Sequence, residues 1–342
     1  MFKTIDRQES TILVSLHLSA AFDMIDHHTL IRLHTSFCIS DASLQWNTSY
    51  LSATSQVVGI DLARSPVSAC SSGVPQGSVL GPILLSLYIA PIAPLASHHG
   101  VLPQKYADDT QLFKSLSPSN HTININSLQH CLSKLHAWYC HNGLTLNADK
   151  SNVIIVGTRQ QLRTHADLLQ VNVAEAQVAV STLTRILGVT IDKNMTIDDY
   201  VKSVCKNSYY HKQAPRRILP MLTEDIVNSV ACLLVNARLH YANSVQFGVT
   251  SKNILKLQMV QNTLARVVTG LQHHKHITPT FKRLHLVWTF TLWTPNYFLP
   301  NSCRRQINLY HATARRQINF RQPLSWRGLF WSLENVATPL EL

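Results

Sequence analysis

Charge is scarce in this chain of 342 residues. Asp, Glu, Lys and Arg together make up 14% of it, against roughly 25% in an average globular domain. Hydrophobic residues make up 45%, which excludes a disordered protein, because such chains combine few apolar residues with high net charge. A chain of this length can form two or three subdomains around a sizeable core. Because charged residues are rare in this chain, a cluster of them indicates a specific structural or functional role.

Acidic residues are almost missing from the second part of the chain. Residues 200–342 contain 18 Lys and Arg but only 4 Asp and Glu, whereas residues 1–199 are close to neutral, with 12 basic and 14 acidic residues. A basic half beside a near-neutral half predicts a polyanionic partner, with nucleic acid as the first candidate. A solvated basic surface without a partner is the alternative.

Paired cysteines and long apolar runs are also lacking. The seven cysteines are scattered, odd in number and never spaced as C-x-x-C, so we expect neither a cysteine zinc site nor a disulfide framework. The first ten residues are polar and mixed in charge, unlike a signal peptide, and we find no apolar run of the about 18 residues that a membrane span needs. We therefore expect an intracellular protein, in the nucleus or cytoplasm, with reduced thiols and no membrane partner.

Two adjacent carboxylates stand out against this background. Asp108 and Asp109 lie between two short apolar stretches, 101–102 and 112–113, that can pair as the arms of a β-hairpin. Successive side chains of a strand point to opposite faces, so at least one carboxylate at the tip can point toward a shared metal ion. The alternative is an ordinary turn, in which Asp is favoured for its own backbone hydrogen bonds.

Hydrophobic patterning predicts an α+β fold up to about residue 195. Strand-length apolar runs stand at 11–18, 56–60, 153–156 and 187–191, the last followed by a tight turn at residue 194. Helices are expected over 19–28, 42–51, 83–93 and 123–142. The helix at 83–93 follows a loop, 73–82, with three glycines and two prolines. Such a loop lets the backbone approach a ligand closely, and the helix start favours phosphate, although a structural turn explains the pattern equally well.

From about residue 196 the apolar period becomes helical. Thr196 followed by Asp199 has the spacing of a capping box, and Thr223 and Ser251 can cap two further helices, whose apolar stripes we interpret as core. Residues 286–342 are rich in Pro, Asn and Arg, show little periodicity and are expected to be loosely ordered.

Four segments in a fixed order resemble the palm of reverse transcriptases, closely that of non-LTR (long interspersed, jockey-like) retrotransposons. They are 18–23 (Leu-Ser-Ala-Ala-Phe-Asp, motif A), 73–82 (Gly-Val-Pro-Gln-Gly-Ser-Val-Leu-Gly-Pro, motif B), 106–109 (Tyr-Ala-Asp-Asp, motif C) and 144–150 (motif D). Two further segments are similar to the primer grip and to the thumb, at 187–189 and 258–270. The resemblance covers roughly residues 5–285.

The resemblance implies an RNA-directed DNA polymerase with a right-hand architecture. Residues 1–195 would form a palm, a small antiparallel sheet with helices on one face, lacking most of the fingers. Residues 196–285 would form a helical thumb, and 286–342 a divergent segment. The partners would be an RNA or DNA template-primer and deoxynucleoside triphosphates. The family's chemistry uses two divalent ions about 3.5–4 Å apart, and Mg²⁺ prefers oxygen ligands.

The resemblance also assigns substrate-binding roles by motif position. Phe22 would be the steric gate that excludes a ribose 2′-hydroxyl. Gln76 and Gly77 would line the template and nucleotide pocket. Lys150 would lie near the triphosphate.

The metal ligands depart from the family pattern at one position. Asp108 would be the main motif C ligand and Asp109 its neighbour, but the motif A aspartate, five residues before Phe22, is His17 here. A neutral imidazole offers one softer nitrogen in place of a two-oxygen carboxylate, a poor exchange for Mg²⁺ although less unfavourable for Mn²⁺. Asp23 lies beyond the strand and is not expected to substitute. We expect a loss of orders of magnitude in rate.

Several interpretations stay open from the sequence. The family's fingers lie upstream of motif A, an endonuclease domain often precedes them, and the resemblance stops near Trp288. A truncated, decayed element copy would explain these features together with His17. The chain would then be an impaired palm and thumb fragment, or a product with no selected role. The alternatives are an active polymerase, using Mn²⁺ or fingers from another chain, and a non-catalytic nucleic-acid-binding module.

Overall fold

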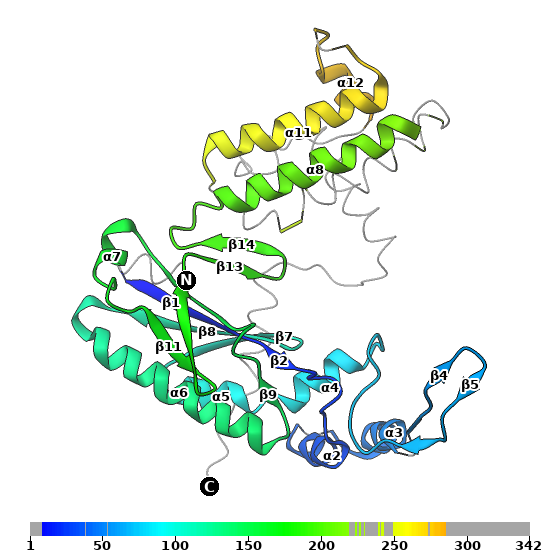
Figure 1. Ribbon diagram of the computed structural model, residues 1–342, viewed down its shortest axis with the longest axis vertical. Coiled ribbons are helices and arrows are strands. Elements are labelled where there is room, and N and C mark those ends of the chain that lie inside the picture. The colour runs from blue at the N-terminus through cyan, green and yellow to red at the C-terminus, as the bar shows by residue number, and fades with distance from the viewer. Residues whose placement is uncertain are drawn as a thin grey trace. The chain divides into compact units, whose positions relative to one another are not determined.

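A computed structural model gives the architecture of the chain (Figure 1). It describes residues 9–218 apart from 38 and 53, single positions between 223 and 242, and residues 249–284 apart from 273. The chain divides into two compact units, Met1–Tyr200 and Val201–Leu342, and each is described by itself. The division lies close to residue 195, where the sequence predicts a change from α+β to helical structure.

A six-stranded sheet forms the centre of the first unit, with the strand order β11-β12-β10-β1-β8-β7. The strands are β1 (Ser10–Leu16), β7 (Leu102–Tyr106), β8 (Asp109–Leu116), β10 (Asn152–Val156), β11 (Gln170–Val173) and β12 (Ala176–Ser181). Neighbours are antiparallel except β10 and β12, which run parallel. The α+β class is confirmed, but the sheet is mixed and not purely antiparallel, because the unpredicted β11–β12 hairpin extends it beyond β10.

The central strand β1 is buried on both faces of the sheet. Six of its seven residues, Ser-Thr-Ile-Leu-Val-Ser-Leu, are buried, as expected for a strand covered on both sides. Ile12 and Val14 belong to the main core. Leu13 points the opposite way and packs with Ile154 and Val156 in a second, smaller cluster. Because the two faces are packed differently, a register slip of one residue would exchange their side chains.

Helices cover the face of the sheet that carries the main core. Five side chains of α6 (His121–His141) are buried at helical spacing: Leu128, Cys131, Leu132, Leu135 and Tyr139. Figure 1 shows α5 (Ile92–His98) and α6 on the same side of the sheet. The predicted amphipathic helix over 123–142 is therefore confirmed.

The helix predicted over 83–93 is divided into two. α4 (Gly81–Tyr88) and α5 are separated by residues 89–91. Pro91 has no N–H to donate and its ring clashes with the preceding turn, so a continuous helix cannot pass through it. The sequence pattern failed here because its apolar run continues across the proline.

The stretch Gly81–His98 is long and apolar enough to cross a membrane by length and composition, contrary to our estimate that no such run exists. Within the described residues it is the one such segment, and 39% of it is buried inside the first unit. Tyr88 and Ile92 are buried in the main core, as in a core helix. The absence of a membrane partner stays a prediction.

Two predicted strands differ from the structure. Residues 56–60 contribute to two short hairpins, in which β3 (Ser55–Gln56) pairs with β6 (Ser68–Ala69) and β4 (Gly59–Ile60) with β5 (Ala63–Arg64). Residues 187–188 are the turn between β13 (Leu183–Ile186) and β14 (Val189–Asp192). Leu187 and Gly188 both have positive φ, 46° and 82°, as the tightest two-residue hairpin turns require.

Near the N-terminus, the helix predicted over 19–28 begins later. Residues 20–24 form a turn, in which the Asp23 N–H donates to the Ala20 carbonyl at 2.9 Å. α2 (His27–Ser36) follows this turn. The helix predicted over 42–51 is confirmed as α3 (Asp41–Leu51).

The described part of the second unit is helical. It contains α8 from residue 201 onward (Asp198–Ile218), α11 (Ser251–Thr269) and α12 (Thr278–Arg283). The N-cap position of α11 is Thr250 and not the predicted Ser251, and it makes no side-chain cap hydrogen bond; most of the predicted apolar stripe is buried. The helix predicted after Thr223 lies almost wholly outside the described residues, and so does the segment 286–342.

The Asp192 carboxylate holds the segment that leads into α8, where the Thr196 hydroxyl also accepts the Asp198 N–H at 3.4 Å. The Asp192 carboxylate accepts the N–H groups of Asn194 at 2.9 Å, Thr196 at 3.1 Å and Ile197 at 2.8 Å. Burial raises the pKa of Asp192, but these hydrogen bonds outweigh burial and hold the pKa below its usual value. One carboxylate thus joins the end of β14 to the start of the helix.

Replacing this carboxylate should destabilise the protein in a pH-dependent way. Asp192→Asn should lower the free energy of unfolding at pH 7 by about 1–3 kcal/mol, the contribution of hydrogen bonds to a charged group. Because the folded pKa is below the unfolded one, this stabilisation is present above about pH 4 and disappears as the pH falls further. Urea unfolding at several pH values should show the difference between wild type and variant narrowing in acid. Asp167→Asn, at an exposed position, is the control; an equal effect of both variants would contradict the assignment.

Candidate active site

The acidic pair lies at the tip of the β7–β8 hairpin, as predicted. Tyr106 pairs with Asp109, so Ala107 and Asp108 form the connection between the strands. Ala107 has a φ of 51°, in the left-handed region that costs a residue with a Cβ roughly 1–2 kcal/mol. Backbone conformations of this kind are concentrated at functional sites.

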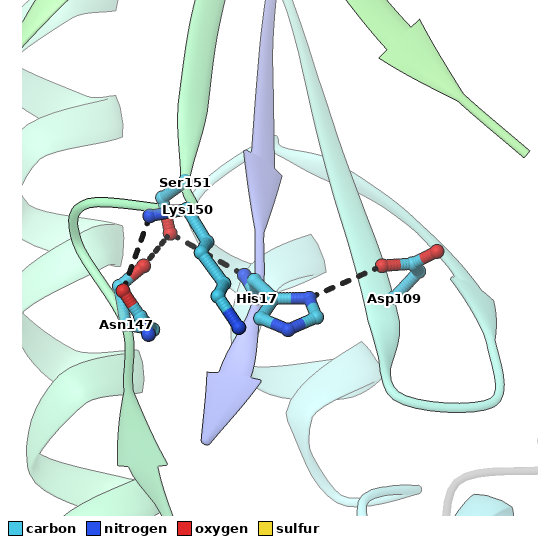
Figure 2. Close-up of polar contacts among 5 residues, drawn as sticks. All are labelled: His17, Asp109, Asn147, Lys150 and Ser151. Atoms are coloured by element: carbon cyan, nitrogen blue, oxygen red, sulfur yellow. Dashed lines mark hydrogen bonds and ion pairs between the residues drawn. The ribbon is translucent and has the colours of Figure 1, made fainter. Parts of the chain in front are cut away.

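His17 lies opposite this tip because of the register of β1 with β8. Leu16 is the last residue of β1 and pairs with Thr110. One step further along both strands brings His17 opposite Asp109, and side chains directly opposite each other share a face of the sheet. The His17 Nδ1 atom lies 3.6 Å from the Asp109 Oδ1 atom (Figure 2).

His17, Asp108 and Asp109 are the one group of three potential metal ligands that the described residues contain. One ligand atom from each lies within 4.8 Å of those of the other two. The side chains of His17 and Asp109 are 31% and 43% exposed, so water and ions can reach them. The structure therefore brings together the two predicted aspartates and His17, where the motif resemblance predicts an aspartate.

The loop between β9 (Thr145–Leu146) and β10 holds the backbone of His17. The Asn147 N–H donates to the His17 carbonyl at 2.8 Å, and the His17 N–H donates to the Ser151 hydroxyl at 3.3 Å. The Ser151 hydroxyl donates in turn to the Asn147 carbonyl at 2.7 Å (Figure 2). Both backbone polar groups of His17 are therefore engaged, which fixes the start of its side chain.

Lys150 belongs to the same loop. Its N–H donates to the Asn147 Oδ1 atom at 3.1 Å, and its side chain is exposed. Figure 2 shows the Lys150 side chain extending from the loop that also carries Ser151. The lysine assigned to the triphosphate thus belongs to the loop that holds His17.

The glycine-rich loop packs against the turn that follows β2 (Leu18–Ser19). The Val74 N–H donates to the Phe22 carbonyl, and the Gly73 N–H to the Ile25 carbonyl, both at 2.8 Å. Gly73 has a φ of 88°, and a Cβ at this position would lie 3.1 Å from the Asp23 carbonyl oxygen. This close approach requires glycine.

The other predicted binding residues belong to this turn and loop. Phe22 is half-buried, and its ring edge lies 3.6 Å from where a Cβ at Gly81 would stand. The exposed Gln76 amide donates to the Asp23 Oδ1 atom at 3.4 Å. Gly77 has a φ of 81° and no atom within 4 Å of a Cβ built on it. Asp23 is outside the cluster of potential ligands, as expected, and the nucleotide-binding roles stay predictions.

Sequence reasoning missed Asn147 and Ser151 as positioning residues. Their spacing of four in the polar segment Asn-Ala-Asp-Lys-Ser is typical of a turn closed by an Asn side chain, and this was the available signal. Their partner, the backbone of His17, lies 134 positions from Ser151 in the sequence, and no local pattern indicates such a contact.

The donor set fits a pair of Mg²⁺ ions poorly. Two ions about 3.5–4 Å apart need oxygen ligands that clamp both of them, and Mg²⁺ requires near-octahedral oxygen coordination. The cluster supplies two carboxylates and one imidazole. A divalent ion can be held here, but the third ligand is a nitrogen, which Zn²⁺ and other transition ions accept more readily.

The class of the protein follows from comparison with known families. Residues 3–191, more than half of the chain, match the family model of the reverse transcriptase (RNA-dependent DNA polymerase). The chain belongs to this family, and its motif resemblance to the enzymes of non-LTR retrotransposons is confirmed by its relatives.

The curated relatives are transposon polymerases of Drosophila. The chain is 25% identical over 297 residues to the probable RNA-directed DNA polymerase from transposon BS of Drosophila melanogaster, covering 84% of this chain and 32% of that protein. It is 25% identical over 268 residues to the RNA-directed DNA polymerase from mobile element jockey of Drosophila funebris, covering 75% of this chain and 28% of that protein. The chain thus spans about a third of the length of these relatives.

Among solved structures, a telomerase of Candida tropicalis in complex with the TWJ fragment of telomeric RNA is similar over 88% of this chain and 49% of that one. The identity is 12% and the TM-score 0.40, which is too low to inform the fold.

Removing the Ser151 hydroxyl should loosen His17. Ser151→Ala leaves the His17 N–H without its acceptor, and an unsatisfied, partly buried donor costs about 1–3 kcal/mol. We expect a loss of this size in the free energy of unfolding, measured by urea denaturation. Ser68→Ala, at an exposed position in β6, should have little effect. Equal stability of the Ser151 variant and wild type would show that the hydroxyl does not hold this strand end.

Proposed function

We propose that the chain is the palm and thumb part of a non-LTR retrotransposon reverse transcriptase that binds primer–template but extends it poorly in Mg²⁺. Residues 1–195 would be the palm and residues 196–285 a thumb-like region. The observation that carries this proposal is the cluster of His17, Asp108 and Asp109, in a chain of the reverse transcriptase family. By motif position this cluster would correspond to a polymerase metal site with one carboxylate replaced by an imidazole.

Binding of nucleic acid is supported by the charge of the second unit. Residues 201–218 and 249–284 contain 11 Lys and Arg and no Asp or Glu. Lys206, Lys252 and Lys275 are exposed there. Cations that neutralise phosphates bind without regard to base sequence and release condensed counterions, so the affinity should depend strongly on salt. A template-primer of RNA and DNA is the partner that the family membership indicates.

The residues around the cluster have chemistry suited to a deoxynucleoside triphosphate. The ring of Phe22 can exclude a 2′-hydroxyl by contact. The open space around Gly77 permits close approach of a base or sugar to the backbone. The exposed Lys150 can attract a triphosphate as a flexible point charge. These roles are inferred from motif position together with this placement.

His17 is the reason why extension should be poor. Replacing an aspartate by a neutral imidazole removes one negative charge and one oxygen ligand from the site. Hard cations such as Mg²⁺ gain most of their binding from such oxygens. Because catalysis by a metal site requires the ion and its ligands in place together, we expect a rate lower by orders of magnitude than with an aspartate.

Heteroduplex affinity should fall steeply with salt. Fluorescence anisotropy with a labelled RNA–DNA duplex, from about 50 to about 200 mM salt, should give a log–log slope near −0.9 for each phosphate neutralised. The double variant Lys252→Gln, Lys275→Gln should bind more weakly with a shallower slope. Lys134→Gln, exposed on α6, is the control in the first unit. A flat salt response would refute binding through the basic second unit.

Primer extension on an RNA template tests the impairment. In Mg²⁺, wild type should extend no better than Asp108→Ala. His17→Asp should exceed both by at least about tenfold, the rate change that corresponds to roughly 1.4 kcal/mol of transition-state stabilisation. Wild-type extension in Mg²⁺ that disappears in Asp108→Ala would identify an active polymerase and overturn the impairment. No gain in His17→Asp would mean that the ligand is not the limiting defect.

A further inference from the structure

The cluster of His17, Asp108 and Asp109 differs from a Mg²⁺ site in a way that favours another ion. Its three potential ligand atoms come from one imidazole and two carboxylates. Imidazole suits Zn²⁺, Cu²⁺, Fe²⁺ and Ni²⁺, whereas an all-oxygen set suits Mg²⁺ and Ca²⁺. One nitrogen ligand therefore shifts the preference of the site toward transition ions.

The spacing of His17 and Asp109 agrees with one small ion between them. Two ligands at 2.0–2.2 Å from a tetrahedral Zn²⁺ ion lie about 3.3–3.6 Å apart. The His17 Nδ1 to Asp109 Oδ1 distance is 3.6 Å, which is too long for a hydrogen bond. The two groups thus approach each other as ligands of a common ion do, without a direct bond between them.

The ligands are held in place by the fold. The backbone N–H and C=O of His17 are bound by Ser151 and Asn147. Asp109 is the first residue of β8 and is paired with Tyr106. Asp108 lies in the hairpin turn and needs only a local adjustment to reach the same ion, because all three ligand atoms already lie within 4.8 Å.

The charge and exposure of the site limit it to one ion. Two carboxylates neutralise the charge of a single divalent cation, and a second cation would have no carboxylate of its own. The side chains are about one-third to two-fifths exposed, so water can complete the coordination. Three protein ligands plus one water is the open arrangement typical of catalytic zinc sites.

We propose that His17, Asp108 and Asp109 form a single-ion site that prefers Zn²⁺, and next Mn²⁺, to Mg²⁺. This inference rests on the proposed function in using the same site, but it needs no polymerase activity. The ion would join the end of β1 to the tip of the β7–β8 hairpin. Zn²⁺ forms more stable complexes than Mn²⁺ with mixed nitrogen and oxygen ligands. We therefore place Zn²⁺ before Mn²⁺ in the preference of the site.

Titration calorimetry of the full chain without nucleic acid tests this proposal. Zn²⁺ should bind with one equivalent assigned to the cluster and at least about 100-fold more tightly than Mg²⁺, following the order of transition-ion affinities. His17→Ala and Asp108→Asn should each abolish that equivalent. His17→Asp should weaken Zn²⁺ binding at least about tenfold and strengthen Mg²⁺ binding, because it restores an all-oxygen set.

Other histidines and cysteines require a matched control. Cys140 and His136 lie one turn apart on α6, with the sulfur 3.8 Å from the ring nitrogens, and can bind Zn²⁺ by themselves. Cys140→Ser should therefore remove any Zn²⁺ held there and leave the cluster equivalent unchanged. The spectrum of bound Co²⁺ separates the two places, because a thiolate ligand adds a near-ultraviolet charge-transfer band that imidazole and carboxylates do not give.

The outcomes are distinct from those for nucleic-acid binding. Equal affinity for Mg²⁺ and Zn²⁺, or Zn²⁺ binding unchanged in both His17→Ala and His17→Asp, would overturn the single-ion site. Circular dichroism of each variant shows whether it is folded. If His17→Ala does not fold, the comparison of His17→Asp with wild type still tests the proposal. Heteroduplex affinity is measured without metal. The calorimetry can therefore contradict the single-ion site while nucleic-acid binding is confirmed, and the anisotropy can contradict nucleic-acid binding while the single-ion site is confirmed.

Discussion

The pairing of β1 with β8 on one side and β10 on the other is the constraint on which the candidate site depends. The pair Leu16–Thr110 brings His17 opposite Asp109, and the pair Ser15–Asn152 brings the loop of Ser151 against the His17 backbone. Both faces of β1 are packed, so a slip by one residue would bury Leu13 in the wrong cluster and move His17 away from the hairpin tip. The packing of the hydrophobic core thus determines the positions of His17 and Asp109, although neither side chain belongs to the core.

Local signals in the sequence predicted the parts of the fold that local physics determines. The amphipathic period of α6 and the arms of the β7–β8 hairpin are properties of short segments. The turn at Leu187 and Gly188 was missed because a leucine with positive φ is uncommon, so an apolar run hid the reversal. The contact of Ser151 with His17 depends on where the chain returns 134 positions later, which no window of neighbouring residues contains. The Asp192 carboxylate bonds within five residues, so its role was within reach of a local reading.

Folding and metal chemistry make separate demands on position 17. The backbone of His17 is bound on both sides, whereas its side chain is partly exposed and makes no contribution to either core cluster. A change of side chain here therefore leaves the packing of β1 intact. The packing of the fold therefore does not depend on whether the residue at position 17 is a metal ligand.

Nucleic-acid affinity and catalysis should respond differently to such a change. Affinity for phosphates is a sum over many exposed cations, each of which contributes a similar amount. Residues 201–218 and 249–284 of the second unit contain 11 Lys and Arg and no Asp or Glu. The rate of catalysis at a metal site depends on the ion, its ligands and the reacting groups being in place together, so their contributions multiply. The loss of one carboxylate changes the affinity for nucleic acid little but can bring the catalytic rate close to zero. If the proposed function holds, a chain with His17 would keep nucleic-acid affinity while its catalysis is impaired.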